Sequence, residues 1–196
     1  MQIAAASSAP TEEPVTLAEY RESNMLTASA GGEDTLTMNL IAARRWAEEY
    51  TGRAFIPRNY QMVVTKKPDI NTIYLQHPPV SAVASVTYDG GKAYSADNYA
   101  FNQFLSALTL KTDKEWPEFT DSLVINYTAG YGAAADVPDA IKRAIILVAA
   151  SFEKAPKLQA AQDNRGLALL RGSDKAAADA MKLLYPFRVL DRLAHA

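Results

Sequence analysis

Two long stretches of the chain carry apolar residues at helical spacing. In residues 33–51 these residues recur three and four positions apart, which is the pattern of a helix with one buried face. Residues 138–155 repeat the pattern and begin with a proline suited to a first helical turn. The positions expected to be buried are Leu36, Leu40, Ala43, Ala47, Tyr50, Ile141, Ala144, Ile145, Val148, Ala149 and Phe152. The pattern therefore predicts two amphipathic helices.

Between these helices the period changes to two. Short runs rich in Val, Ile, Tyr and Thr over residues 58–131 predict four to six strands. Asp89-Gly90-Gly91 is suited to a tight hairpin turn, because glycine accepts a positive φ without penalty. The predicted fold class is α+β, with helices packed around a small antiparallel β-sheet that is inserted between the two main helices.

The ends of the chain differ from this central region. Residues 1–14, rich in Ala, Ser, Pro and Glu, are predicted to form a flexible N-terminal tail. Thr16 and Glu19 have the spacing of a capping box and predict a short helix over residues 17–26. A last helix is expected to end at Pro186, which leaves residues 15–185 as the main domain and 186–196 as a C-terminal arm.

Composition narrows the class of protein. The chain has 196 residues, 48% hydrophobic and 21% charged, as expected of a globular domain with a core. It contains no cysteine, which excludes disulfides, thiol catalysis and cysteine-ligated metals. No apolar run approaches the roughly 20 residues that a membrane-spanning helix needs, and the N-terminus has no signal-peptide pattern. We therefore expect no membrane association and assembly in a host cytoplasm.

Charge is unevenly distributed along the chain, although the net charge is only −2. Residues 1–50 carry eight acidic and three basic side chains, whereas residues 137–196 carry six acidic and ten basic ones. Such a gradient can orient one subunit against an oppositely charged neighbour. It also fits ordinary solvated helix faces, and it is not the basic stripe of a sequence-specific DNA-binding protein.

No catalytic, cofactor or metal site is indicated. Gly130-Tyr131-Gly132 precedes a helix but lacks the Lys-Ser/Thr of a phosphate loop and the third glycine of a dinucleotide fingerprint, so we interpret it as a strand-to-helix corner. His77 and His195 are the only histidines and have no metal-ligand spacing. Glutamates and aspartates at 48–49, 115–118 and 136–139 lie outside any calcium-loop frame. The chain is predicted not to be an enzyme and to need no cofactor.

Four cations on the two main helices are candidates for contacts with a partner. Arg44 and Arg45 lie on the first helix, and Lys142 and Arg143 lie on the second. They are predicted to face outward and to contact the acidic N-terminal region of a neighbouring copy. The alternatives are ordinary surface and a channel wall that DNA slides past.

Five motifs occur in a recognisable order: a helix ending in "YTGR" that runs into a strand, "PPVSAVASV", "YTAGYG", "VPDAIK" and "LLYPFR". In this order the chain resembles the head–tail connector, or adaptor, family of tailed phages. The resemblance covers residues 15–192, and the Ala-rich segment between residues 156 and 180 departs from it.

The resemblance implies a structural virion protein of the neck. Copies would form a ring, commonly of twelve, that extends the DNA channel under the portal protein and offers a docking face to a tail-side neck or stopper protein. DNA would pass through non-specifically. Two alternatives stay open: another neck or tail-completion ring protein, and an enzyme with an unrecognised site.

The C-terminal arm is the predicted portal-binding segment. Its residues are too apolar to remain in water and too few to form a core. The predicted contacts are Phe187, Arg188, Val189, Leu190, Arg192 and Leu193. The alternative is that Phe187 and Leu190 fold back onto their own subunit.

Overall fold

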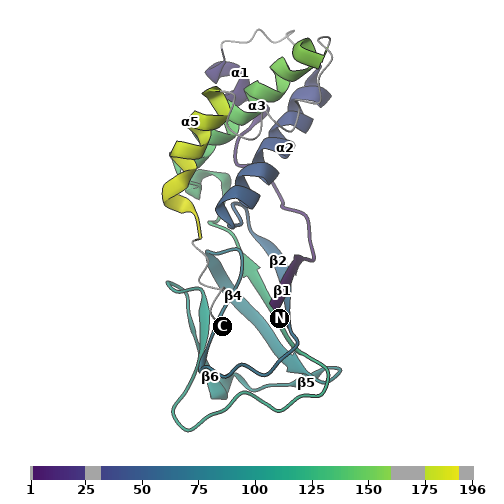
Figure 1. Cartoon of the computed structure of the whole chain (residues 1–196), viewed down its shortest axis with the longest axis vertical. Coiled ribbons are helices and arrows are strands. Elements are labelled where there is room, and N and C mark those ends of the chain that lie inside the picture. Colours follow the sequence, from purple (N-terminus) through teal and green to yellow (C-terminus); the bar gives the residue numbers. More distant parts are fainter. Residues whose placement is uncertain (1, 25–31, 160–174, 190–196) are drawn as a thin grey trace. The chain divides into compact units, whose positions relative to one another are not determined.

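The computed structural model describes residues 2–24, 32–159 and 175–189 (Figure 1). These residues form two compact units. Of the described residues, 2–11, 52–132 and 189 belong to the sheet unit, and 12–24, 32–51, 133–159 and 175–188 belong to the helical unit. The strand-rich segment is therefore inserted in the sequence between the two main helices, as predicted.

The helical unit contains α1 (Leu17–Ser23), α2 (Glu33–Thr51), α3 (Asp139–Gln159) and α5 (Lys175–Leu184). Helix α3 packs against both α2 and α5 (Figure 1). Short 3-10 turns cover Ala134–Asp136 and Tyr185–Phe187. The predicted buried stripes are confirmed at Leu36, Leu40, Ala43, Ala47, Ile141, Ala144, Ile145, Val148 and Ala149. No helix among the described residues is long and apolar enough to cross a membrane.

Helix α1 is held by its cap and by one buried tyrosine. The predicted capping box is present, because the Glu19 N–H donates to the Thr16 hydroxyl and the Glu19 carboxylate accepts from the Thr16 N–H. The Tyr20 side chain is fully buried and its hydroxyl donates to the Glu153 carboxylate at 2.8 Å. Burial and the Glu153 carboxylate both raise the pKa of Tyr20, so this hydroxyl stays protonated and keeps the hydrogen bond.

Replacing Tyr20 with Phe should lower the free energy of unfolding by about 1.5–3 kcal/mol, the usual contribution of a hydrogen bond to a charged group. Tyr50→Phe is the matched control, because no hydrogen bond of its hydroxyl is found among the described residues. Chemical denaturation monitored by circular dichroism measures both. Equal stability of the two variants would contradict a stabilising role for the Tyr20–Glu153 bond.

The sheet unit contains two antiparallel sheets. The larger has the order β1-β2-β8-β4-β5 and the smaller has the order β3-β7-β6. The strands are β1 (Gln2–Ala6), β2 (Arg58–Val64), β3 (Thr72–Tyr74), β4 (Val80–Tyr88), β5 (Lys92–Ala93), β6 (Tyr99–Asn102), β7 (Ala107–Leu110) and β8 (Leu123–Ala129). The α+β fold class is confirmed. The expectation of a single sheet was wrong, because pairing between strands does not follow from their periodicity.

Both sheets share one buried cluster. Alternate residues of β8, from Leu123 to Ala129, are buried, as are Tyr60, Met62 and Val64 on β2. Ile73 and Leu108 of the smaller sheet belong to the same cluster. The predicted Asp89-Gly90-Gly91 turn joins β4 to β5, and the Gly91 N–H donates to the Tyr88 carbonyl at 3.2 Å.

The predicted flexible N-terminal tail is corrected by the structure. Residues Gln2–Ala6 form β1, which pairs with residues Tyr60 to Val64 of β2. Further along, Pro14 and Val15 are buried in the helical unit. A composition poor in large apolar residues suggested disorder, but an edge strand gains its order from the backbone hydrogen bonds of its neighbour.

Candidate functional site

Gly130-Tyr131-Gly132 is the chain corner that the sequence indicated. The Gly130 N–H donates to the Pro79 carbonyl at 2.8 Å, and the Tyr131 N–H donates to the Phe55 carbonyl at 3.0 Å. Gly130 has a φ of +144°, and a Cβ atom there would lie 2.4 Å from the backbone nitrogen of Pro57. Close backbone packing therefore requires glycine at position 130. The amides of Gly130 and Tyr131 already donate hydrogen bonds within the fold and are not free to bind a phosphate.

Three of the remaining polar candidate groups contain a residue with a structural partner. The His77 ring stacks on Tyr60 with centroids 4.8 Å apart, and the Lys67 ammonium pairs with the Glu118 carboxylate at 2.6 Å. The Asp136 carboxylate accepts from the Ala133 N–H at 2.9 Å. In the described ranges no group of three His, Cys, Asp or Glu residues could hold a metal ion. His195 lies outside the described residues.

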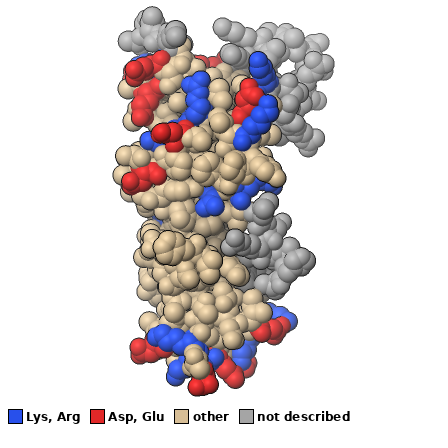
Figure 2. Space-filling model, turned by 90° about the vertical axis from the view of Figure 1, so that its left-hand side faces the viewer, with Lys and Arg blue, Asp and Glu red and all other residues tan. Residues whose placement is uncertain are grey.

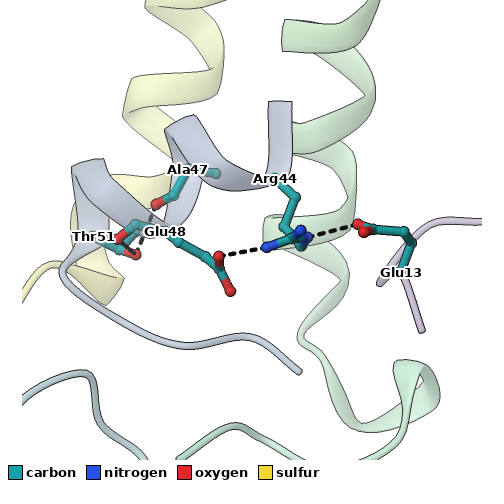
Figure 3. A network of polar contacts seen from close by, with 5 residues as sticks. All are labelled: Glu13, Arg44, Ala47, Glu48 and Thr51. Atoms are coloured by element: carbon teal, nitrogen blue, oxygen red, sulfur yellow. Dashed lines mark hydrogen bonds and ion pairs between the residues drawn. The ribbon is translucent and has the colours of Figure 1, made fainter. Parts of the chain in front are cut away.

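Arg44 is buried rather than outward-facing, which corrects the sequence-based interpretation. The exposed fraction of Arg44 is 2%. The guanidinium Nε donates to the Glu13 carboxylate at 2.7 Å, and NH1 donates to the Glu48 carboxylate at 2.7 Å (Figure 3). At the C-terminal end of α2, the Thr51 hydroxyl donates to the Ala47 carbonyl at 2.8 Å. Arg44 thus joins α2 to the acidic N-terminal region of its own chain, not to that of a neighbouring copy.

The electrostatics of this network favour the charged guanidinium. Burial by itself lowers the pKa of Arg44, because it removes water from the cation. Hydrogen bonds and negative charges from Glu13 and Glu48 outweigh that effect and raise the pKa above its usual value. A buried cation with two carboxylate partners is a structural anchor.

The other three cations remain available at the surface. Arg45 and Arg143 are exposed, and Lys142 is half-buried. Neither Arg45 nor Arg143 forms an ion pair with any described residue. Lys142 contributes, after the hydrogen bonds of Thr16, to a lowered pKa of Glu19. The structure therefore separates Arg44 from the predicted group and leaves Arg45 and Arg143 as solvent-facing charges.

An apolar groove lies beside Arg45 and was not predicted. It has a volume of about 500 Å³ and lies between α2 and Phe152 of α3. Its apolar lining includes Met38, Ile41 and Trp46, with Arg45 and Glu49 also at its surface. We call this the apolar groove. The sequence did contain a signal for this groove. Apolar residues of α2 such as Ile41 and Trp46 lie beside the buried stripe rather than in it.

The C-terminal candidates divide into two groups. Phe187 is half-buried in the 3-10 turn that follows α5, and the Arg188 guanidinium lies over the Tyr50 ring at 5.1 Å. Val189 is half-buried next to Gly52. Leu190, Arg192 and Leu193 lie outside the described residues. The expected departure of the chain directly at Pro186 is corrected, since Pro186 lies within the 3-10 turn and both Arg188 and Val189 contact their own chain.

Comparison with known protein families shows to which family the chain belongs. The sequence model of the head completion protein family matches residues 13–167. The chain belongs to this family. The five motifs had indicated a resemblance to head–tail proteins of tailed phages, and this family match confirms it. No curated protein sequence matches the chain.

Solved structures share the fold over the whole chain. A chain described as the neck of an empty GTA particle with C6 symmetry aligns with a TM-score of 0.76 at 22% identity. Chains from the virion of a native gene transfer agent (GTA) particle and from its neck with C12 symmetry align with TM-scores of 0.74 and 0.70, at 22% and 21% identity. Each alignment covers 98% of both chains. At these identities the likeness establishes a common fold for this head completion protein.

Proposed function

We propose that this head completion protein is a structural subunit of the neck of a phage-like virion. Copies form a ring, of twelve in the virion, between the portal protein and a tail-side neck or stopper protein, and the ring extends the DNA channel. The observation that carries the proposal is the full-length fold match, 98% of both chains, to a protein of a particle neck, in a chain of the head completion family. The C6 and C12 symmetries of the matched particles support a ring.

The charge pattern supports non-specific passage of DNA. In Figure 2 the charged residues of the sheet unit gather at its lower end, with both signs present. Ion pairs of the sheet unit include Lys66 with Asp69, in the loop after β2, and Lys67 of the same loop with Glu118. Paired charges of both signs hold phosphates weakly, which suits a channel that DNA must slide through. We propose no catalytic activity.

The test of the proposal is co-purification with the portal protein followed by electron microscopy. A ring seated on the portal is the expected result. A ring that binds tail-side proteins but not the portal favours the alternative, another neck or tail-completion ring protein. Absence of any ring, alone or with the portal, contradicts both.

Reversing one surface charge tests the contact between subunits. We propose that Arg45 and Arg143, with Lys142, contact acidic groups of the neighbouring copy. Arg45→Glu should then weaken ring assembly about tenfold or more, since a like-charge contact replaces an attractive one. Lys92→Glu, on an exposed residue of the sheet unit, is the control. Mass photometry measures assembly. Intact rings with altered DNA ejection would favour the channel alternative.

Truncation tests the C-terminal arm. We propose that residues after Val189 bind the portal, while Phe187 and Arg188 position the arm by packing on their own chain. Removing residues 190–196 should abolish co-purification with the portal and leave the melting temperature unchanged. Portal binding that survives the truncation would rule out the arm as the docking element.

A further inference from the structure

The hairpin between β6 and β7 carries two apolar side chains into solvent. Phe104 is fully exposed and Leu105 is 46% exposed. Within the segment from Asn102 to Ser106 no residue is charged. We call Phe104 and Leu105 the apolar tip. Exposed large apolar side chains that lie together mark binding surfaces more often than isolated ones do.

The apolar tip is held in place by hydrogen bonds on both sides. The Leu105 N–H donates to the Asn102 side-chain oxygen at 3.1 Å, and the Ser106 N–H donates to the Gln103 carbonyl at 3.1 Å. Ser106 is buried, and its hydroxyl oxygen accepts from the Val80 N–H at 3.1 Å. A tip ordered before binding loses little conformational entropy when it binds. Its exposure is therefore built into the hairpin.

The apolar groove of the helical unit is the complementary surface. Its volume of about 500 Å³ accommodates an aromatic and an aliphatic side chain together. Trp46 and Ile41 are only half-buried and Met38 is 68% exposed, so apolar area is left open to water there. Arg45 and Glu49 also line the groove. Because the segment from Asn102 to Ser106 is uncharged, it can enter the groove without burying another charge next to these two.

A ring needs two different surfaces on each copy. In a cyclic assembly one face of a subunit contacts a different face of the next, and the contact repeats until the ring closes. The apolar tip and the apolar groove are two such surfaces, and they lie in different units of the chain. They also contain three of the five large hydrophobic residues that are exposed in the described part of the chain.

We propose that the apolar tip of one copy inserts into the apolar groove of the next copy around the ring. Phe104 packs against Trp46 and Met38, and Leu105 packs toward Phe152. Arg45 and Glu49 flank the contact and exclude water from its edge. This inference rests on the proposed ring-forming function and names the residues that join its subunits.

Disulfide trapping tests the contact, and the absence of native cysteine makes the test specific. Two proteins, one with Met38→Cys and the other with Phe104→Cys, are mixed at high concentration and oxidised. A disulfide between the two substituted positions, identified by mass spectrometry of peptides, is expected to dominate. Ile70→Cys replaces Phe104→Cys in the control, because Ile70 is an exposed apolar residue of the same unit, at 44%. Cross-linking no greater than in this control overturns the contact.

A second pair of variants separates binding from folding. Phe104→Ser should weaken self-association more than about tenfold, as loss of a central aromatic contact does. Its melting temperature should not change, since the side chain is fully exposed. Ile70→Ser should leave association unchanged, and equal association of both variants overturns the contact.

Imaging of the unaltered chain distinguishes the two proposals. If the unaltered chain forms rings but the cysteine variants do not give the specific disulfide, the ring function stands and the contact is wrong. The specific disulfide in open chains or dimers, with no rings alone or on the portal, shows the reverse.

Discussion

Replacing Arg44 with Ala should lower the free energy of unfolding by about 3–5 kcal/mol, the cost of removing one partner from a buried ion pair. The reason lies in the surroundings of the guanidinium, whose side chain is 3% exposed and bonded to both Glu13 and Glu48. The Glu48 side chain is 10% exposed and would be left without its cation. Urea denaturation of the subunit, at a concentration below assembly, measures the loss.

The neighbouring arginine provides the control for this prediction. Arg45 lies on the same helix but is exposed, so Arg45→Ala should change stability by no more than about 0.5 kcal/mol. A double substitution, Arg44→Met with Glu48→Leu, should recover much of the loss because it removes the buried carboxylate together with the cation. Equal stability of Arg44→Ala and Arg45→Ala would show that the network contributes nothing to folding.

Replacing Gly130 with Ala should cost about 3–5 kcal/mol or prevent folding. The added Cβ would lie 2.4 Å from the Pro57 nitrogen and 2.5 Å from the Ile56 carbonyl carbon, which are backbone atoms that cannot rotate away. The φ of +144° adds strain, because this region is accessible essentially to glycine alone. Thermal unfolding and the yield of soluble protein report the effect.

Gly90→Ala separates the clash from the backbone strain. Gly90 also has a positive φ, +75°, but nothing lies within 4 Å of the position of its added Cβ. The expected cost is only about 1–2 kcal/mol, that of a left-handed conformation. If both glycine variants lose the same stability, close packing at the corner is not the cause.

Local sequence patterns were sufficient to predict the main helices and the hairpin turn. Helix α2 spans Glu33–Thr51, the range that the apolar spacing predicted, and the capping box at Thr16 starts α1 at Leu17. The hairpin turn at Asp89-Gly90-Gly91 and the corner at Gly130 were also predicted. The helix, the cap and the hairpin turn depend on residues close together in sequence, so a single sequence contains the information. At Gly130 the sequence indicated the corner, but the close packing against Ile56 and Pro57 that requires glycine there is a tertiary contact.

The candidate site was predicted only in part. Arg45 and Arg143 are at the surface as expected, but Arg44 is not. Glu48, one helical turn from Arg44, was a visible partner, whereas Glu13 lies 31 residues away in sequence. The apolar groove requires α2 and α3 to be placed side by side, which no local pattern specifies.

The sequence by itself therefore determined the main helices, the strand-rich region between them, the position of the hairpin turn, and the order of motifs that marks the family. Tertiary structure decided that residues 2–6 become an edge strand, that β2 pairs with β8, and that Arg44 is buried between two carboxylates. The physical reason is the range of the interactions. Periodicity, caps and turns arise from neighbouring residues, whereas strand pairing and the burial of a charge depend on segments brought together only by folding.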